Sequence, residues 1–229
     1  MSCAHTKIKT SLDRWNEAHW DLHEIEEHYH YPEPFRYSFN AFLRVIKEVH
    51  QMLKMDLQNE ADYRSFIKPL VDSLRQDQLL NTLGEKRNFV VHQGMLEIKS
   101  KGSAGSTRGN AKIKMGVGFN VPAWESSDDA FLRFAKSCER HKDFRGLLGL
   151  DDDDLFPCIQ REWLLKEFGD RDLLELAIDA WRKTGAIISQ LVVHFGEQPL
   201  DLSLSCGHAP EQTRMKIYTR KQFRDAMGG

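Results

Sequence analysis

A long apolar stripe near the C-terminal end constrains the fold more than any other feature of the sequence. Over residues 170–195, apolar positions alternate at spacings of four and three for about seven helical turns. They are Leu174, Ile178, Trp181, Gly185, Ile188, Val192 and Phe195. Because a helix this long must bury its apolar face along its whole length, it needs other helices as partners. The chain is therefore expected to be mainly α-helical.

The first part of the chain contains suitable partner helices. A helix is predicted from Ser11, a favourable N-cap residue, and the proline-containing corner at 31–34 separates it from a second helix. Two more helical stretches follow, one interrupted by Pro69 and one running from about Asp77 to His92, before Gly94. We expect these core helices, over 11–94, to form an antiparallel helical bundle with the long helix.

The remaining segments predict a small β component within a single domain over 1–229. The expected elements are a β-hairpin insertion over 95–125, further helices over 128–195 and a C-terminal β-hairpin over 198–221. In the insertion, residues 96–98 and 112–115 are expected to be strands, and the glycine- and serine-rich segment 101–106 a flexible connector.

Composition limits the possible functions. The formal net charge of −2 excludes a globally basic nucleic-acid-binding surface, so any such site must be a local patch. The N-terminal residues show no signal peptide, and no apolar run approaches the roughly 20 residues that span a bilayer. The cysteines lie far apart with no C-x-x-C pair: Cys3, Cys138, Cys158 and Cys206. We expect a cytoplasmic protein that does not bind membranes.

Three polar residues at the end of the fourth helix are the main candidates for chemistry. Arg87 offers a planar fork of donors suited to phosphate oxygens. His92 can exchange a proton near neutral pH, and Asn88 could orient either group. Residues five apart on a regular helix point about 140° apart. His92 must therefore lie where the helix ends, or its partner must come from a second copy.

The segment Arg87-Asn88-x-x-x-His92 resembles the R-x4-6-H motif of the HEPN superfamily, a group of helical domains found in defence systems. Trp15 in the first helix and the segment 34–43 in the second also resemble HEPN-like patterns. The resemblance covers about residues 11–94 and, more loosely, 170–195.

This resemblance implies a metal-independent endoribonuclease of a defence or toxin–antitoxin system, with no cofactor. Two copies would pair, so RNA, a second copy of the chain and an antitoxin are the expected partners. His92 would transfer protons at the RNA 2′-hydroxyl, which DNA lacks, and Arg87 would hold the scissile phosphate. The alternative is a non-catalytic RNA- or nucleotide-binding module, with Arg87 and His92 serving the dimer interface or nucleotide recognition. A purely structural role is also open, with Arg87 in a helix-end salt bridge and His92 complementing the helix dipole.

Basic residues near the motif are expected to contact the RNA backbone. They are Lys86, Lys99, Lys101, Arg108 and Lys112. Ordinary solvated side chains on an exposed hairpin are an equally good interpretation.

Two further clusters carry weaker signals. His19 and His23 lie four apart and could ligate zinc, but spacing defines no third ligand, so no metal site is predicted. The run Asp151–Asp154 is interpreted as a loop with a helix N-cap rather than a magnesium site.

Overall fold

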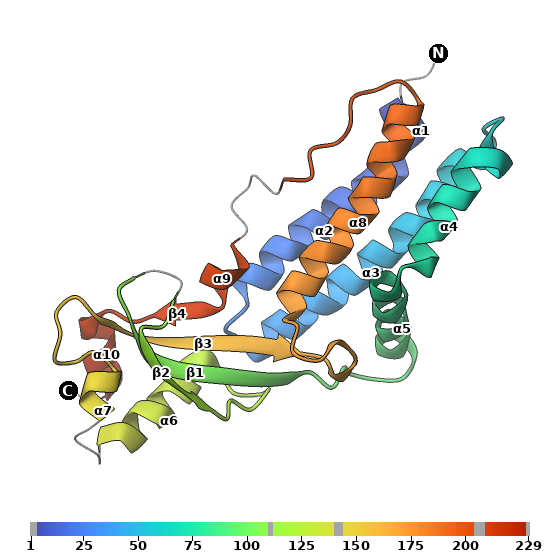
Figure 1. Ribbon diagram of the computed structural model, residues 1–229. Coiled ribbons are helices and arrows are strands. Elements are labelled where there is room, and N and C mark those ends of the chain that lie inside the picture. Colours follow the sequence, from blue (N-terminus) through green and yellow to red (C-terminus); the bar gives the residue numbers. More distant parts are fainter. Residues whose placement is uncertain (1–3, 110–111, 140–143, 204–208, 228–229) are drawn as a thin grey trace. The chain divides into compact units, whose positions relative to one another are not determined.

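The computed structural model describes residues 4–109, 112–139, 144–203 and 209–227 (Figure 1). Over these residues the protein is mainly helical and contains a four-stranded antiparallel sheet, which confirms the predicted helical class. The chain divides into two compact units. The helical unit comprises Met1–Ile25, Arg36–Glu97 and Leu174–His208, and the sheet unit comprises Glu26–Phe35, Ile98–Leu173 and Ala209–Gly229. None of the helices within the described residues is long and apolar enough to cross a membrane.

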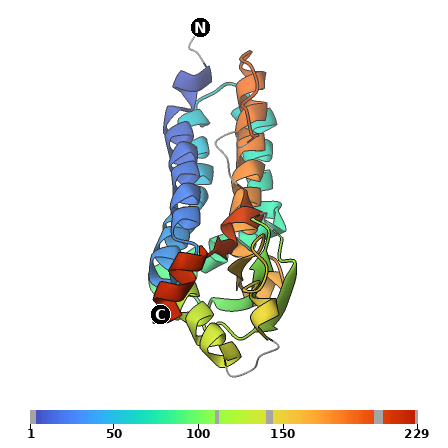
Figure 2. The ribbon, with the colours of Figure 1, turned by 90° about the vertical axis from the view of Figure 1, so that its left-hand side faces the viewer.

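Helices make up most of the helical unit. They are α1 (Ala4–Lys7), α2 (Lys9–Glu27), α3 (Pro32–Leu57), α4 (Lys68–Gln76), α5 (Gln78–His92) and α8 (Leu173–His194). Figures 1 and 2 show α2, α3, α4 and α8 lying side by side. A π-helical turn, Tyr63–Ile67, precedes α4, and Pro69 occupies the first turn of that helix. Pro69 therefore helps to begin a helix instead of interrupting one, because a first-turn residue needs no N–H donor.

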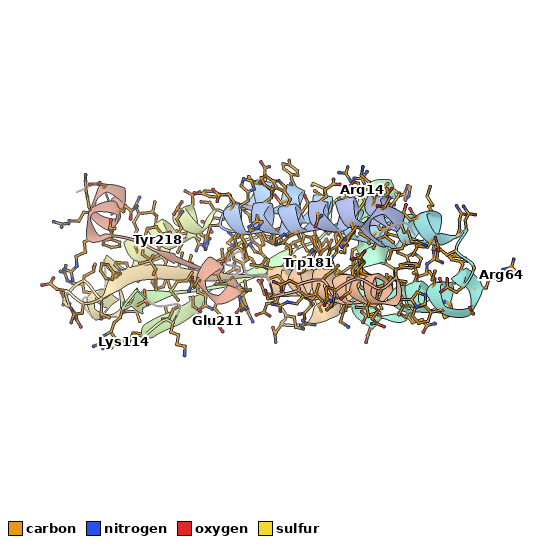
Figure 3. All side chains as sticks on the ribbon, turned by 90° about the horizontal axis from the view of Figure 1, so that it is seen from above. Arg14, Arg64, Lys114, Trp181, Glu211 and Tyr218 are labelled. Atoms are coloured by element: carbon orange, nitrogen blue, oxygen red, sulfur yellow. The ribbon has the colours of Figure 1, made fainter. Side chains whose placement is uncertain are left out.

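A pair of tryptophans joins α2 to α8. The rings of Trp15 and Trp181 stack with their centroids 4.4 Å apart. Figure 3 labels Trp181. Trp15 Nε1 donates to the carbonyl oxygen of Trp181 (3.1 Å), and Trp181 Nε1 donates to that of Trp15 (3.2 Å). A side chain at Gly185 would collide with Trp15, since its Cβ would lie 2.6 Å from the ring. The apolar stripe of the long helix thus includes Gly185 because the indole ring of Trp15 occupies the space that a larger side chain would need.

The sheet unit is built on one central antiparallel pair. Its strands are β1 (Lys99–Thr107), β2 (Met115–Phe119), β3 (Phe156–Leu164) and β4 (Met215–Ile217), in the order β2-β1-β3-β4. Its helices are α6 (Ser127–Glu139), α7 (Phe144–Leu147), α9 (Pro210–Thr213) and α10 (Arg220–Met227). The β1–β3 pairing extends from Lys99 opposite Leu164 to Thr107 opposite Phe156. Residues from α6 and α10, together with Tyr218 just after β4, pack against the sheet, with Phe131 stacked on Tyr218 at 4.2 Å.

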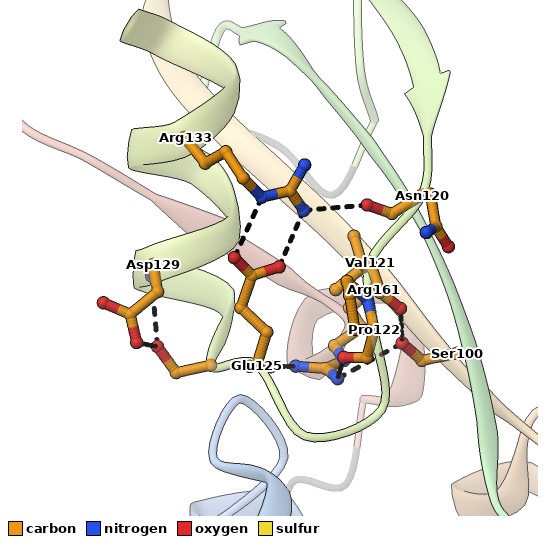
Figure 4. A network of polar contacts seen from close by, with 9 residues as sticks. Ser100, Asn120, Val121, Pro122, Glu125, Asp129, Arg133 and Arg161 are labelled. Atoms are coloured by element: carbon orange, nitrogen blue, oxygen red, sulfur yellow. Dashed lines mark hydrogen bonds and ion pairs between the residues drawn. The ribbon is translucent and has the colours of Figure 1, made fainter.

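A buried arginine of the sheet forms hydrogen bonds to the segment 120–126 (Figure 4). Arg161 is fully buried on β3 and lies 3.7 Å from the centroid of the Trp163 ring. Its guanidinium donates to the carbonyl oxygens of Glu125 (2.6 Å) and Pro122 (3.1 Å). Burial lowers the pKa of Arg161 to about 10, which leaves it charged at neutral pH.

The strand assignments correct three expectations. The segment 101–106 lies inside β1 and is not a flexible connector. Its glycines are required by close packing, since a Cβ at Gly105 would lie 1.9 Å from the Met115 oxygen. Residues 156–164 lie within the range expected to be helical but form β3. The buried Arg161 of this strand obtains its hydrogen-bond acceptors only when the sheet unit is folded. Consequently the Asp151–Asp154 run precedes a strand and not a helix.

The expected C-terminal hairpin over 198–221 is not confirmed. β4 pairs with β3, through Cys158 opposite Ile217 and Gln160 opposite Met215, and the described residues 199–203 form no strand. Residues 204–208, which include part of the expected hairpin, lie outside the described residues. Alternating apolar residues indicate that a segment can be a strand, but they do not identify its partner.

Candidate functional site

The predicted motif lies on α5, which extends as a helix to His92. The side chain of Asp77 caps its first turn by accepting from Leu80 N (3.1 Å). Arg87 is half-buried, and its Nε is buried with no hydrogen-bond partner among the described residues. His92 is exposed. Since α5 is helical over the whole interval, Arg87 and His92 point about 140° apart, and one chain does not bring them together.

Asn88 belongs to a different arrangement, built around Lys47 of α3. Lys47 Nζ donates to Asn88 Oδ1 (2.6 Å) and to the carbonyl oxygen of Gly84 (3.2 Å). Gly84 leaves room for this side chain, because its Cβ would lie 3.8 Å from Lys47 Cδ. His92 is four residues beyond Asn88 and therefore lies on the same face of α5.

Three cations gather at this point of the helical unit. Burial, and then the nearby charges of Arg87 and Arg75, lower the pKa of Lys47. Within the described parts of the chain, none of the three forms an ion pair, and Lys47 donates only to neutral oxygens. We call Lys47, Arg75 and Arg87 the cationic cluster. Like charges repel one another, so an anion bound here would be stabilised.

A cavity of about 240 Å³ lies beside the cationic cluster. Four helices supply its lining: Ile46, Lys47, His50, Gln51, Leu74, Arg75, Leu80, Asn81, Gly84, Glu85, Asn88 and Thr184. The lining combines apolar side chains with amides, cations and the carboxylate of Glu85. Such a mixture is typical of small-ligand sites, in which a few polar groups orient a ligand against apolar walls.

His50 is the buried polar group of this cavity. It is 8% exposed, and its Nε2 has no hydrogen-bond partner among the residues that the structure describes. The closest carboxylate oxygen, Asp72 Oδ1, lies 3.8 Å away, beyond hydrogen-bond distance. Burial, and then the charges of Lys54 and Arg75, lower the pKa of His50 to about 4. The imidazole is therefore neutral at pH 7 and can accept or donate one further hydrogen bond.

Asp72 does not neutralise the cationic cluster. It forms ion pairs with Lys54 and with Lys68, the latter at 2.8 Å. Hydrogen bonds from these two lysines hold the pKa of the Asp72 carboxyl well below its usual range. The negative charge of Asp72 is thus already compensated by Lys54 and Lys68.

The expected RNA-contacting residues are divided between the two units. Lys86 is half-buried on α5 in the helical unit. The other four belong to the sheet unit and are exposed: Lys99, Lys101, Arg108 and Lys112. Lys101 forms ion pairs with Glu162 (2.9 Å) and Asp170 (3.4 Å), so its charge is partly compensated.

The histidines of α2 have a structural explanation. The His19 ring lies 5.0 Å from that of His23 and stacks on Trp181 at 5.0 Å. Within the described residues, no group of three or more His, Cys, Asp or Glu side chains is arranged to hold a metal ion.

Lys47, His50 and Arg75 were missed by reasoning from the sequence. The sequence did contain a signal for two of them. Lys47 and His50 are polar residues that directly follow Ile46 and Val49 of the apolar stripe of α3, and polar residues are uncommon at buried positions unless they have a specific role. Gly84, inside a helix, was a second signal, because glycine there often marks a close approach by another side chain.

Comparison with known families gives one match. The family model described as bacteriophage lambda protein ea47 matches residues 2–212. No curated protein and no solved structure matches the chain. The expected HEPN resemblance is therefore wrong, since the matching family is another one and covers nearly the whole chain. An arginine and a histidine at this spacing also arise on an ordinary helix, where they need not act together.

Proposed function

The chain belongs to the bacteriophage lambda protein ea47 family, and from its helical unit we propose that it binds the phosphate group of an RNA or a nucleotide. The binding site is the cavity lined by α3, α4, α5 and α8. One observation carries the proposal: Lys47 and Arg75 line this cavity, Arg87 acts on Lys47 from nearby, and none of the three has a carboxylate partner among the described residues. This is the non-catalytic alternative among the functions considered from the sequence.

Two features favour phosphate as the anion. Arg75 and Arg87 offer planar donor forks that match pairs of phosphate oxygens. Lys47 is already held in place by Gly84 and Asn88, so little side-chain entropy would be lost when it contacts a ligand.

The test is a binding titration by fluorescence anisotropy with a labelled 5′-phosphorylated oligoribonucleotide, competed by nucleoside 5′-monophosphates. Lys47→Met and Arg75→Gln should each weaken binding about 10- to 100-fold, the usual effect of losing one charge-assisted hydrogen bond. Lys136→Met is the matched control, because Lys136 is an exposed lysine of the sheet unit. Equal affinities for the wild type and both cavity variants would refute the proposal.

RNA cleavage is a second candidate, favoured by the position of His92 on the same face of α5 as Asn88. In this arrangement Lys47 would hold the phosphate and His92 would transfer the proton. Incubation of RNA with the protein in EDTA should then yield cyclic-phosphate ends, and His92→Ala should abolish them. If RNA that is bound through Lys47 stays intact, the protein is a binding module.

Several expectations depend on this choice and stay predictions. We infer that the helical unit is an antiparallel bundle, and that the protein acts in the cytoplasm. Pairing of two copies and an antitoxin partner belong to the cleavage candidate. Turnover of RNA by the wild-type protein distinguishes the two functions, because Arg87→Ala should weaken binding in either case.

A further inference from the structure

The cavity beside the cationic cluster has two chemically different ends. Lys47, Gly84 and Asn88 define the first end, where Lys47 Nζ is held by two oxygens. Gln51 of α3 and Asn81 of α5 lie about one helical turn away, on the second end. Lys47 and Asn88, which suit a phosphate, are therefore separated along the helices from another set of lining groups, and Arg75 lies near both Lys47 and His50.

The second end is suited to a planar ring. Ile46, Leu74 and Leu80 provide apolar wall, and Ile46 and Leu74 are 6% and 7% exposed. His50 adds a buried imidazole whose Nε2 is unpartnered among the described residues. A buried polar atom without a hydrogen bond is unfavourable in free energy. A ligand heteroatom that hydrogen-bonds to His50 Nε2 would remove this unfavourable contribution and so favour binding.

Polar side chains surround this end. The amides of Gln51 and Asn81 are exposed and offer both donors and acceptors, and Glu85 adds an acceptor. Asn81 Nδ2 contacts Glu85 Oε1 at 3.5 Å, a weak bond that a ligand can replace. The edge of a nucleobase presents complementary donors and acceptors, whereas a sugar phosphate alone would leave the apolar wall uncovered.

We propose that this cavity holds one nucleoside 5′-monophosphate unit, with the phosphate at Lys47, Asn88 and Arg75 and the base against Ile46, Leu74, Leu80 and His50. The inference rests on the proposed phosphate site and specifies its ligand. The unit is a free nucleotide or the 5′-terminal nucleotide of an RNA, since both present the same chemistry. A cavity of about 240 Å³ is of small-ligand size.

Calorimetric titration of the full chain tests the inference with matched ligands: inorganic phosphate, ribose 5-phosphate, and the four common nucleoside 5′-monophosphates. At least one nucleotide should bind about tenfold or more tightly than ribose 5-phosphate, because the base adds apolar burial and a hydrogen bond. Comparison of a 5′-phosphorylated hexaribonucleotide with its 5′-hydroxyl form distinguishes the RNA end from the free nucleotide. A clear preference for the 5′-phosphorylated RNA over the free nucleotide identifies the RNA end as the source.

Two variants separate the base from the phosphate. His50→Leu should lower nucleotide affinity by about tenfold and leave ribose 5-phosphate affinity unchanged. Asn81→Ala, at an exposed position that tolerates substitution, should act in the same direction if His50→Leu does not fold. Lys47→Met should weaken both ligands.

The outcomes are distinguishable. Nucleotides that bind no more tightly than ribose 5-phosphate, with both sensitive to Lys47→Met, would overturn the nucleotide inference and keep the phosphate site. Absence of binding by every phosphate ligand would overturn both.

Discussion

Two glycines of the helical unit show how differently one residue type can be used. The Cβ of an alanine at Gly84 would meet Lys47 Cδ and Cε at 3.8 Å, an ordinary contact. At Gly185 the same atom would lie 2.6 Å from Trp15 and 2.7 Å from Leu202 Cδ2. Both positions are inside helices, so glycine costs helix propensity at each. Only Gly185 is required by its neighbours.

Alanine substitution should therefore have opposite effects at the two positions. Gly84→Ala should raise the free energy of unfolding by about 0.5–1 kcal/mol through helix propensity. Gly185→Ala should lower it by about 1–3 kcal/mol, because Trp15 must move from its stacked position. Urea unfolding followed by tryptophan fluorescence measures both, and equal changes of the same sign would contradict the packing described here.

A buried histidine of the sheet unit makes stability depend on pH. Burial, followed by the charges of Lys216 and Arg161, lowers the pKa of His30 to about 4, and its Nδ1 lies 2.8 Å from Ser127 Oγ. In the unfolded chain the pKa is about 6.5. Between these two pH values the unfolded state binds more protons than the folded state. The contribution of His30 to the free energy of unfolding is therefore lost as the pH falls from about 6.5 to 4.

Comparison with a variant isolates this contribution. The stability difference between wild type and His30→Gln should shrink when the pH is lowered from 7 to 5, measured by urea unfolding at each pH. Burial, and then the charge of Glu17, raise the pKa of Asp21 to about 6, so Asp21 changes stability with pH in the opposite direction. Because Asp21 is present in both proteins, its effect cancels in the difference between them. A difference that stays constant with pH would show that His30 is not held neutral.

Among the elements, β3 depends most on contacts that are distant in sequence. Its Arg161 contacts residues at 100, 122 and 125, and the backbone N–H of Trp163 donates to Asp172 Oδ2 (2.8 Å). Asp172 also accepts from the buried Tyr29 hydroxyl, whose pKa burial raises well above its ordinary value. A strand with a charged residue at its centre is stable only where these partners surround it.

Removal of the Arg161 side chain should reveal this dependence. Arg161→Met should destabilise the protein by about 3 kcal/mol, because the carbonyl oxygens of Pro122 and Glu125 lose their donor (Figure 4). Arg133→Met is the matched control: Arg133 is exposed and its bonds to Glu125 should contribute less than about 1 kcal/mol. Chemical denaturation of both variants gives the comparison, and losses of similar size would contradict the assigned role of Arg161.

For the molecule as a whole, each of the two units is assembled from stretches that are far apart in the sequence. The chain passes between the units several times, and residues 209–227 return to the sheet unit after α8 has completed the helical unit. This last segment contributes β4, paired with β3, and Tyr218 and Phe223, which contact Phe131. The C-terminal segment is thus part of the core of the sheet unit.

Deletion of residues 209–229 should therefore affect one unit much more than the other. Amide hydrogen exchange should become faster throughout β1, β3 and α6, whereas α2 and α8 should keep their protection around the Trp15–Trp181 pair. Full-length protein is the reference. Equal loss of protection in both units would contradict this division of the chain.

The sequence by itself determined the long helices of the helical unit, because a 3.6-residue period of apolar side chains is a local property that each segment displays alone. The stripe that includes Trp181, the Asp77 start of α5 and the proline corner after α2 were all readable in this way. Tertiary structure decided the pairing of β3 with β1 and β4, and the meeting of Lys47 with Asn88, 41 positions apart. Such contacts depend on which surfaces bury each other, and local periodicity carries no information about that choice.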